Sequence, residues 1–317
     1  MRALARAWRA WVELMDRREP ATQLALVRIA IGVVLVADLL NVRRLGLVEP
    51  LWTPPPVGYA VHYTPWLGLG ASALWAIALV AAACLAAGAA TRAACVVFVL
   101  ASIQMSQLAP EAECGVDMIF RVVLLVLALS RCNARWSLDA MIARRFRRPP
   151  PALVPAWPRY LILLQVVWVY ASGGQNKSGG EWGPWGGFAA LADSLADPHA
   201  ARFTAGWVPA VLPLTRIATA LTMAFEVGAP LYLLFLYYAA TRDRPGRLRA
   251  WCNRWRLRWI WLGLGVSFEL GLAVMLRLDL FPYGMLAMFP ALVLASDVER
   301  VYRRNTPGPA NRASSPS

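Results

Sequence analysis

The chain contains a succession of apolar runs, each close in length to a helix that crosses a membrane. About 20 residues of α-helix cover the ~30 Å of hydrocarbon in a bilayer. Of the 317 residues, 59% are hydrophobic and 16% are charged, whereas an ordinary soluble domain has roughly 25% charged residues. The sequence therefore predicts an all-α fold, a polytopic membrane helix bundle with about eight transmembrane helices. The predicted spans lie at about residues 22–41, 66–89, 93–109, 116–130, 157–172, 210–238, 255–276 and 281–297.

The positive charge of the chain gathers in short segments between these apolar runs. A formal net charge of +14 could suggest a nucleic-acid partner, but that function needs basic residues gathered on one soluble face. With the N-terminus inside, the cytoplasmic segments carry 24 of the 32 lysine and arginine residues. Because basic loops tend to stay in the cytoplasm, we expect a multi-pass protein of the inner (plasma) membrane with both termini cytoplasmic. We expect no nucleic-acid partner.

The two ends of the chain differ from the apolar region at residues 21–300. In residues 1–20, arginines recur at helical spacing opposite leucine, tryptophan and methionine, and no small-residue cleavage site of a signal peptide follows. This pattern predicts an amphipathic interfacial helix on the inner membrane surface. Residues 301–317 end in a Pro/Ser-rich stretch, which predicts a disordered cytoplasmic tail.

A glycine- and tryptophan-rich stretch, GGQNKSGGEWGPW at residues 173–185, contains the only lysine of the chain, Lys177. Glycine permits close backbone approach, and irregular backbone at membrane depth is tolerated where it is buried in protein or lines a cavity. Tryptophan suits the membrane interface. The stretch therefore predicts a Gly/Trp-rich outer-face loop folded toward the membrane, followed by a short helix around residues 188–197.

Three interpretations of Lys177 are open. If its amine is desolvated among aromatic side chains, the neutral form can act as a base. If it lies against Glu181, the ion pair is structural. If it extends toward water, it is an ordinary interfacial lysine. Nearby polar and aromatic residues are candidates for substrate binding, and these are Gln165, Tyr170, Trp182 and Trp185.

Ionisable residues within the predicted spans are expensive to bury and are usually paired or functional. Asp117 and Arg121 are four residues apart, so they share a helix face and can form a structural ion pair. The two histidines lie in predicted outer loops, and the five cysteines include no CxxC spacing. We therefore expect no metal site and no disulfide.

Glu226 and Glu269 have no opposite charge in their own helical turn. Each must find a partner on another helix or stay protonated, and Arg28 and Arg216 are the candidate partners. For both glutamates, a structural ion pair within the bundle and a role in a functional site remain open.

Four stretches in a fixed order resemble the bacterial HTTM family, the horizontally transferred transmembrane domain related to vitamin K-dependent gamma-carboxylase. The resemblance covers about residues 15–300. The stretches are QLALVRIAIGVVLVADLL, GVDMIFRVVLLVLALSRCNARWSLD, QVVWVYASGGQNKSGGEW and LFPYGMLAMFPALVL.

For the carboxylases, this resemblance implies a lysine that deprotonates vitamin K hydroquinone. Oxygen then converts the product into a stronger base, which removes a γ-proton from glutamate before CO2 adds. The lysine in the matching segment is Lys177, followed by Glu181 and Trp182. The implied cofactor is a quinol such as vitamin K hydroquinone or menaquinol, without a metal. The WSLD stretch, with Trp136, Ser137 and Asp139, also matches the family pattern.

This chain departs from the carboxylases at three places. Ala134 stands where they have a histidine, Glu269 stands where many relatives have another, and we expect no counterpart of their large extracytoplasmic domain. The candidate catalytic residues are Lys177, Glu181 and Glu269.

Two functions follow. One is an enzyme that uses Lys177 as base on a quinol or other lipid-soluble substrate, with a membrane lipid or quinone and a secreted peptide or protein as partners. The other is a non-enzymatic membrane helper for the maturation or export of a secreted peptide, resembling the HTTM-type protein needed for a bacterial sporulation-delaying peptide toxin. A transporter is weaker, because no inverted repeat with broken helices is present.

Overall fold

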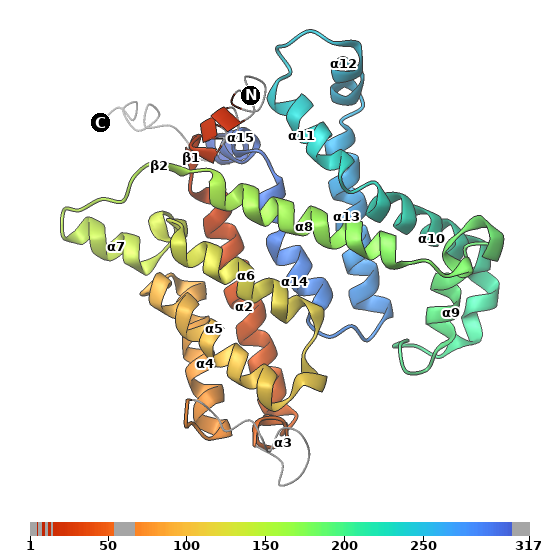
Figure 1. The fold of residues 1–317 in the computed structure, drawn as a ribbon, viewed down its shortest axis with the longest axis horizontal. Coiled ribbons are helices and arrows are strands. Elements are labelled where there is room, and N and C mark those ends of the chain that lie inside the picture. Colours follow the sequence, from red (N-terminus) through yellow and green to blue (C-terminus); the bar gives the residue numbers. More distant parts are fainter. Residues whose placement is uncertain (1–4, 6–7, 10–11, 14, 54–66, 306–317) are drawn as a thin grey trace, which may run out of the picture. The chain divides into compact units, whose positions relative to one another are not determined.

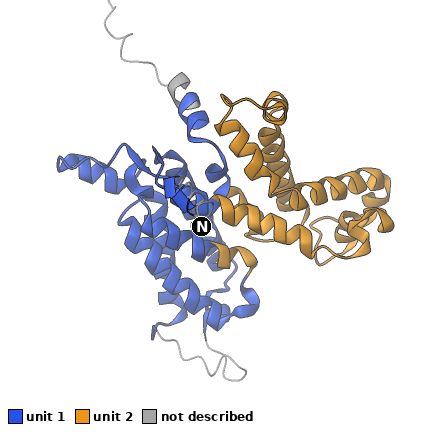
Figure 2. Ribbon diagram, turned by 45° about the horizontal axis from the view of Figure 1, so that its top comes forward, with its two compact units in different colours: residues 1–113, 120–162, 288–317 blue, residues 114–119, 163–287 orange. Residues whose placement is uncertain are grey.

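A computed structural model describes the chain except for residues 1–4, 6–7, 10–11, 14, 54–66 and 306–317. The described part is built from α-helices, short 3-10 helices and one two-stranded sheet (Figure 1). The predicted all-α fold is therefore confirmed. The chain divides into two compact units (Figure 2), the first made of residues 1–113, 120–162 and 288–317, and the second of residues 114–119 and 163–287.

The first unit holds most of the N-terminal half of the chain. Its α-helices are α2 (Thr22–Arg44), α3 (Val48–Trp52), α4 (Ala71–Ala87), α5 (Thr91–Leu108), most of α6 (Gly115–Leu129), α7 (Leu138–Arg145), the start of α8 (Trp157–Asn176) and α15 (Ala295–Asn305). Its 3-10 helices are η2 (Pro110–Ala112), η3 (Cys132–Ala134) and η7 (Phe289–Leu292). Strands β1 (Arg18–Pro20) and β2 (Leu153–Pro155) pair antiparallel. Helix α2 packs against α4, and α4 packs against α5.

A buried arginine forms hydrogen bonds with the backbone at the end of α4, next to the turn that leads into α5. Gly88 takes a positive φ of 70° there, as glycine does readily at helix C-termini. Arg28 on α2 is fully buried, and its guanidinium donates to the backbone oxygens of Leu85 (2.7 Å), Ala86 (3.0 Å) and Trp136 (2.5 Å). These bonds satisfy carbonyls that a helix end leaves free. Arg28 therefore has a structural role in the first unit.

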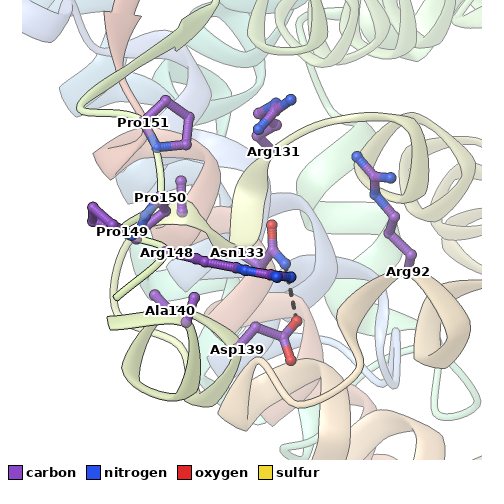
Figure 3. A pocket seen from close by; sticks show the side chains of 11 residues that line it. Arg92, Arg131, Asn133, Asp139, Ala140, Arg148, Pro149, Pro150 and Pro151 are labelled. Atoms are coloured by element: carbon purple, nitrogen blue, oxygen red, sulfur yellow. Dashed lines mark hydrogen bonds between the residues drawn. The ribbon is translucent and has the colours of Figure 1, made fainter. Parts of the chain in front are cut away.

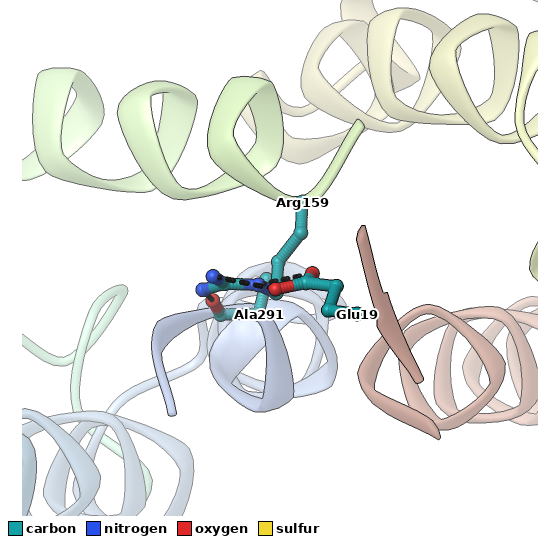
Figure 4. A network of polar contacts seen from close by, with 3 residues as sticks. All are labelled: Glu19, Arg159 and Ala291. Carbon is teal, nitrogen blue, oxygen red and sulfur yellow. Dashed lines mark hydrogen bonds and ion pairs between the residues drawn. The ribbon is translucent and has the colours of Figure 1, made fainter. Parts of the chain in front are cut away.

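A buried ion pair anchors the small sheet. The Arg159 guanidinium donates to both carboxylate oxygens of Glu19, at 2.6 and 3.0 Å, and to the backbone oxygen of Ala291 at 3.1 Å (Figure 4). A bidentate pair of this kind is among the strongest polar contacts in proteins. It joins β1, α8 and η7 within the first unit.

The second unit holds the Gly/Trp-rich stretch and the helices that follow it. Its elements are the remainder of α8, the 3-10 helices η4 (Gly180–Trp182), η5 (Pro184–Gly186) and η6 (Ala205–Val211), and helices α9 (Ala190–Ala196), α10 (Leu212–Val227), α11 (Leu231–Ala240), α12 (Arg247–Arg254), α13 (Leu257–Met275) and α14 (Phe281–Met288). Helix α9 confirms the short helix predicted around residues 188–197. It packs against α10 and η6.

Four described helices are long and apolar enough to cross a membrane, and three further apolar helices are shorter. The four are Thr22–Arg44, Thr91–Leu108, Ala205–Val227 and Leu257–Met275. The shorter three are Ala71–Ala87, Leu231–Ala240 and Phe281–Leu292. Large apolar side chains such as Val80, Leu129 and Leu214 are exposed on the helices, as expected of surfaces that face lipid. The membrane class agrees with the prediction, whereas the count of eight spans is not confirmed.

Two predicted spans are wrong in their extent. The run at 210–238 is broken between α10 and α11 at Gly228–Pro230, because proline lacks the amide hydrogen of a helix interior and clashes with the preceding turn. The run at 281–297 stops being α-helical at Met288, just before Pro290, and a separate helix begins at Ala295.

The predictions for the two chain ends fall largely on residues outside those described. Within the predicted interfacial helix at residues 1–20, Arg18–Pro20 form strand β1, and much of the rest is not described. The predicted tail at residues 301–317 begins too early, because α15 continues to Asn305. Residues 306–317 lie outside the described part of the chain.

Candidate functional site

Helix α8 ends directly before Lys177 and passes unusually close to α10. It runs to Asn176, four residues beyond the predicted end of the span, so Gly173 and Gly174 are helical rather than part of a loop. A Cβ atom added at Gly174 would lie 2.9 Å from the amide nitrogen of Val227, closer than real Cβ atoms approach. Gly174 is therefore required for the close approach of the two helices.

Lys177 forms an ion pair with Glu226, which lies in the last turn of α10. Its Nζ contacts Glu226 Oε2 directly, and the lysine side chain is 22% exposed whereas that of Glu226 is only 5% exposed. The ammonium also lies over the Trp182 ring, 5.1 Å from its centroid, which is cation–π geometry. Lys177 is therefore held between a carboxylate and an indole rather than extended freely into water.

A second buried polar pair lies in the same unit. Tyr170 on α8 donates its hydroxyl to Oε1 of Glu269 on α13 at 2.5 Å, and both side chains are buried. Among the residues that the structure describes, Oε2 of Glu269 has no hydrogen-bond partner although it is buried. Such an atom is uncommon, because an unsatisfied buried polar group destabilises a fold by about 1–3 kcal/mol.

Aromatic rings surround Tyr170. Its ring centroid lies 4.7 Å from that of Phe225 and 6.0 Å from that of Trp261, in edge-to-face arrangements. Phe268 is 6.3 Å away, and the Trp261 indole donates to the backbone oxygen of Phe225 at 3.3 Å. The rings hold the Tyr170 hydroxyl in a dry setting, where its hydrogen bond to Glu269 is strengthened.

The structure gives Glu226 a partner that the sequence did not suggest, and it gives Arg121 an ion-pair partner outside its own helix. Glu226 pairs with Lys177 and not with Arg28, which is held in the first unit. Arg121 forms an ion pair with Glu113.

Asp117 and Arg216 also have defined settings. Asp117 accepts a hydrogen bond from the backbone nitrogen of Cys114 at 2.9 Å, at the start of α6. Arg216 lies exposed on α10, near Gly187.

The other predicted site residues lie at different depths. Glu181 and Trp182 are half-buried in η4, and Gln165 is half-buried on α8, five residues before Tyr170. Trp185 is 91% exposed, which suits an interfacial side chain more than the wall of a closed pocket. Within the described ranges, no group of three or more histidine, cysteine, aspartate or glutamate side chains could hold a metal ion.

The ion pair between Lys177 and Glu226, which organises this site, is not predicted by the sequence. Lys177 and Glu226 are 49 residues apart, and a pairing between helices at that distance leaves no periodic signal. One signal was nonetheless present. The helix must end near Gly228 and Pro230, which places Glu226 at a helix terminus, where a loop lysine could reach it.

Comparison with known proteins gives one family. A family model described as HTTM domain matches residues 16–243, which includes Lys177, Trp182 and Glu226. Neither the curated proteins nor the solved structures contain a match to the chain.

Proposed function

The chain belongs to the HTTM domain family, and we propose that it acts on a quinol or another lipid-soluble hydroxyl compound, with Lys177 as the base. The observation that carries the proposal is the direct contact between Lys177 Nζ and the buried Glu226 carboxylate. A lysine amine is a useful base only when it can lose its proton, and Glu226 provides an acceptor for that proton.

The proton steps require only these two side chains. In a desolvated pair, the proton of the Lys177 ammonium passes to Oε2 of Glu226, which leaves an amine and a carboxylic acid with no change in net charge. The amine then accepts the proton of the substrate hydroxyl, leaving an anionic substrate oxygen and an ammonium. The ammonium beside that oxygen stabilises the new charge, as preorganised cations do at developing oxyanions.

The residues around the pair suit a quinol. The Trp182 indole offers a flat apolar face to an aromatic ring, and the buried Oε2 of Glu269 offers an acceptor that lacks a partner among the described residues. Gln165, Tyr170 and Trp185 are the further candidates for substrate contact, as the sequence suggested. When bound, a quinol would supply an acidic hydroxyl and oxygen-dependent chemistry. Glu181, close to Trp182 in η4, remains a candidate catalytic residue.

Replacing Lys177 by arginine tests the proposal. Arginine keeps the positive charge but does not deprotonate in proteins, so Lys177→Arg should lower the rate of oxygen-dependent consumption of vitamin K hydroquinone or menaquinol by about 100-fold or more. The rate would be measured on the purified protein against a blank without protein. Arg216→Lys is the matched control, because this exposed arginine lies on the same helix as Glu226.

Wild-type consumption in the Lys177→Arg protein, with normal expression and membrane insertion, would overturn the base assignment. A lipid extract of purified wild-type protein gives an independent test, since a quinone-binding protein should retain quinone through purification. An extract without quinone, together with no quinol consumption, would also contradict the proposal.

The same ion pair also supports a second function, in which it is only a structural contact. Lys177 and Glu226 join the end of α8 to the end of α10, where Gly174 allows close packing. In a non-enzymatic helper for maturation or export of a secreted peptide, the pair would only hold the helices together. Lys177→Arg should then preserve the cellular phenotype, because arginine can still pair with Glu226.

A further inference from the structure

A pocket in the first unit is lined by arginines from three separate segments. It encloses about 370 Å³, near the lower end of the roughly 300–1,000 Å³ typical of small-molecule sites. Arg92 comes from the first turn of α5, Arg131 follows α6, and Arg148 follows α7 (Figure 3). Asn133, Asp139 and Pro149–Pro151 also line the pocket.

Both oxygens of the single carboxylate in the pocket already accept hydrogen bonds from other groups of the protein. Asp139 Oδ1 accepts from the backbone nitrogen of Ala90 at 2.7 Å. Its Oδ2 accepts from the Thr91 backbone nitrogen (3.1 Å), the Thr91 hydroxyl (2.9 Å) and the Asn133 amide (2.9 Å). Asp139 thus caps the start of α5, where the helix dipole favours negative charge.

The three arginines keep their hydrogen-bonding groups available. In the part of the chain that the structure describes, none of Arg92, Arg131 and Arg148 is in an ion pair, and all three are exposed. The pocket is therefore lined by three arginines and by one carboxylate whose oxygens already accept hydrogen bonds from Ala90, Thr91 and Asn133. The pocket has an excess of positive charge and unused planar donors, which match the oxygens of a phosphate group.

The segment that carries Arg148 is held in place at both ends. The backbone nitrogen of Arg148 donates to the backbone oxygen of Ala143 at 2.8 Å, near the end of α7. After Arg148 the chain continues through Pro149–Pro151 into strand β2. Proline fixes its own φ, and it restricts the preceding residue to extended backbone. The arginine is therefore presented from a rigid segment, and less conformational entropy is lost when it binds a ligand.

We propose that this pocket is a binding site for a phosphate-bearing anion, held by the guanidinium groups of Arg92, Arg131 and Arg148. A membrane lipid headgroup and free phosphate share this chemistry. The proposal rests on the first unit alone and is independent of the quinol reaction assigned to Lys177.

Binding by full-length protein in detergent, stripped of lipid, tests the site with two probes. Native mass spectrometry would measure binding of phosphatidylglycerol, with diacylglycerol as the control lipid that lacks the phosphate. Inorganic phosphate would be tested by thermal shift and as a competitor of the lipid, at constant ionic strength. Lipid binding without an effect of phosphate identifies a headgroup site, and displacement by phosphate identifies a site where the phosphate alone suffices; both results support the proposal.

The test variant replaces Arg92, Arg131 and Arg148 by glutamine. The matched control replaces Arg144, Arg145 and Arg147 by glutamine. These three arginines are exposed in the same region and do not line the pocket. We expect the pocket variant to weaken binding of whichever probe binds by at least about tenfold, and the control to change it less than about twofold. A second pocket variant with lysine at the three positions keeps the charge but loses the fork geometry, and should lie between the two.

Equal losses in the pocket and control variants would show a general effect of surface charge and would overturn the proposal, as would failure of both probes to bind the wild-type protein. Melting curves without probe verify folding. If the glutamine variant does not fold, the lysine variant decides, and wild-type binding by that variant contradicts the site.

Discussion

In the ion pair between Lys177 and Glu226, the carboxylate is more deeply buried than the ammonium. This difference in burial determines how loss of the lysine should affect stability. Lys177→Met would leave the almost fully buried carboxylate without a cation. We expect the free energy of unfolding to fall by up to about 3 kcal/mol, the lower end of the range for breaking a buried pair, because the lysine is partly exposed. The double variant Lys177→Met/Glu226→Gln removes the unpaired charge and should recover much of this loss.

Unfolding in detergent by denaturant would provide the three free-energy differences of a double-mutant cycle. Additive losses would mean that the two side chains do not interact in the protein. The same cycle separates stability from catalysis, since a double variant with restored stability but no quinol consumption assigns the chemistry to the pair.

Asp139 makes the stability of the first unit depend on pH. Burial opposes ionisation of this carboxyl, but hydrogen bonds from Asn133, Thr91 and Ala90 outweigh burial, so its pKa lies below the ordinary value. A pKa lowered by folding means that the carboxylate stabilises the fold above the unfolded value of about 3.9, and that this stabilisation is lost as pH falls through the folded pKa. We expect Asp139→Asn to lower the melting temperature at pH 7, and the difference from wild type to shrink below about pH 4.

Melting temperatures between pH 7 and pH 3 would check this expectation. Asp243→Asn serves as the control, because Asp243 is exposed and its replacement should leave the pH profile unchanged. A gap between Asp139→Asn and wild type that stays constant down to pH 3 would contradict the assignment.

At the scale of elements, the contact between α8 and α10 depends on one glycine and tolerates change at its neighbour. In Gly174→Ala, the new Cβ would meet backbone and side-chain atoms of Val227 and Glu226 at 2.9–3.0 Å. We expect the helices to separate and the unfolding free energy to fall by about 1–3 kcal/mol. In Gly173→Ala the nearest atom is Glu226 Oε1 at 3.5 Å, an ordinary contact, so this variant should be as stable as wild type or slightly more stable.

Thermal unfolding of the two variants measures the difference, and cross-linking between cysteines placed on α8 and α10 would report their separation. Equal stability of both alanine variants would show that the helices are not packed as closely as the structure has them.

The sequence predicts the boundaries of helices well where turn-forming residues and the apolar pattern agree. It predicts them poorly where glycine or proline and the apolar pattern point to different boundaries. The start of α2 and the position of α9 agree with the sequence. The continuous apolar residues at 210–238 predict one helix, although Gly228 and Pro230 end α10. At Gly173 and Gly174 the prediction is wrong in the other direction, because a loop is expected where a helix continues. The glycine content predicts a loop, whereas these residues lie in α8, which packs against α10.

At the scale of the whole molecule, the class of the protein followed from composition because burial of apolar surface in lipid is a property of the chain as a whole. The site could be predicted only in part. Lys177 was identifiable as an isolated lysine in an unusual segment, but its partner depends on helix packing that no local pattern encodes. The same limit applies to Arg28, which the sequence offers as a partner for a glutamate and which instead binds backbone carbonyls.

The distribution of basic residues makes a prediction about the whole chain, namely that the segment around Lys177 faces outward and the segment around α7 faces the cytoplasm. Single cysteines at two exposed positions, Ser178 and Met141, would test it. The partly exposed native cysteines, Cys84 and Cys114, would first be replaced by alanine. In intact cells, a membrane-impermeant thiol reagent should label the cysteine at 178, whereas the cysteine at 141 should react only after the membrane is permeabilised.

The reverse labelling pattern would place Lys177 on the cytoplasmic side, and labelling of both positions in intact cells would mean that the chain inserts in two orientations. Either result would change the proposed function, because a secreted peptide can meet the base only at the outer face. The same experiment also bears on the arginine pocket. Its residues Arg131 and Arg148 flank α7, so cytoplasmic labelling at 141 would direct the search for its phosphate-bearing ligand to the inner leaflet and the cytoplasm.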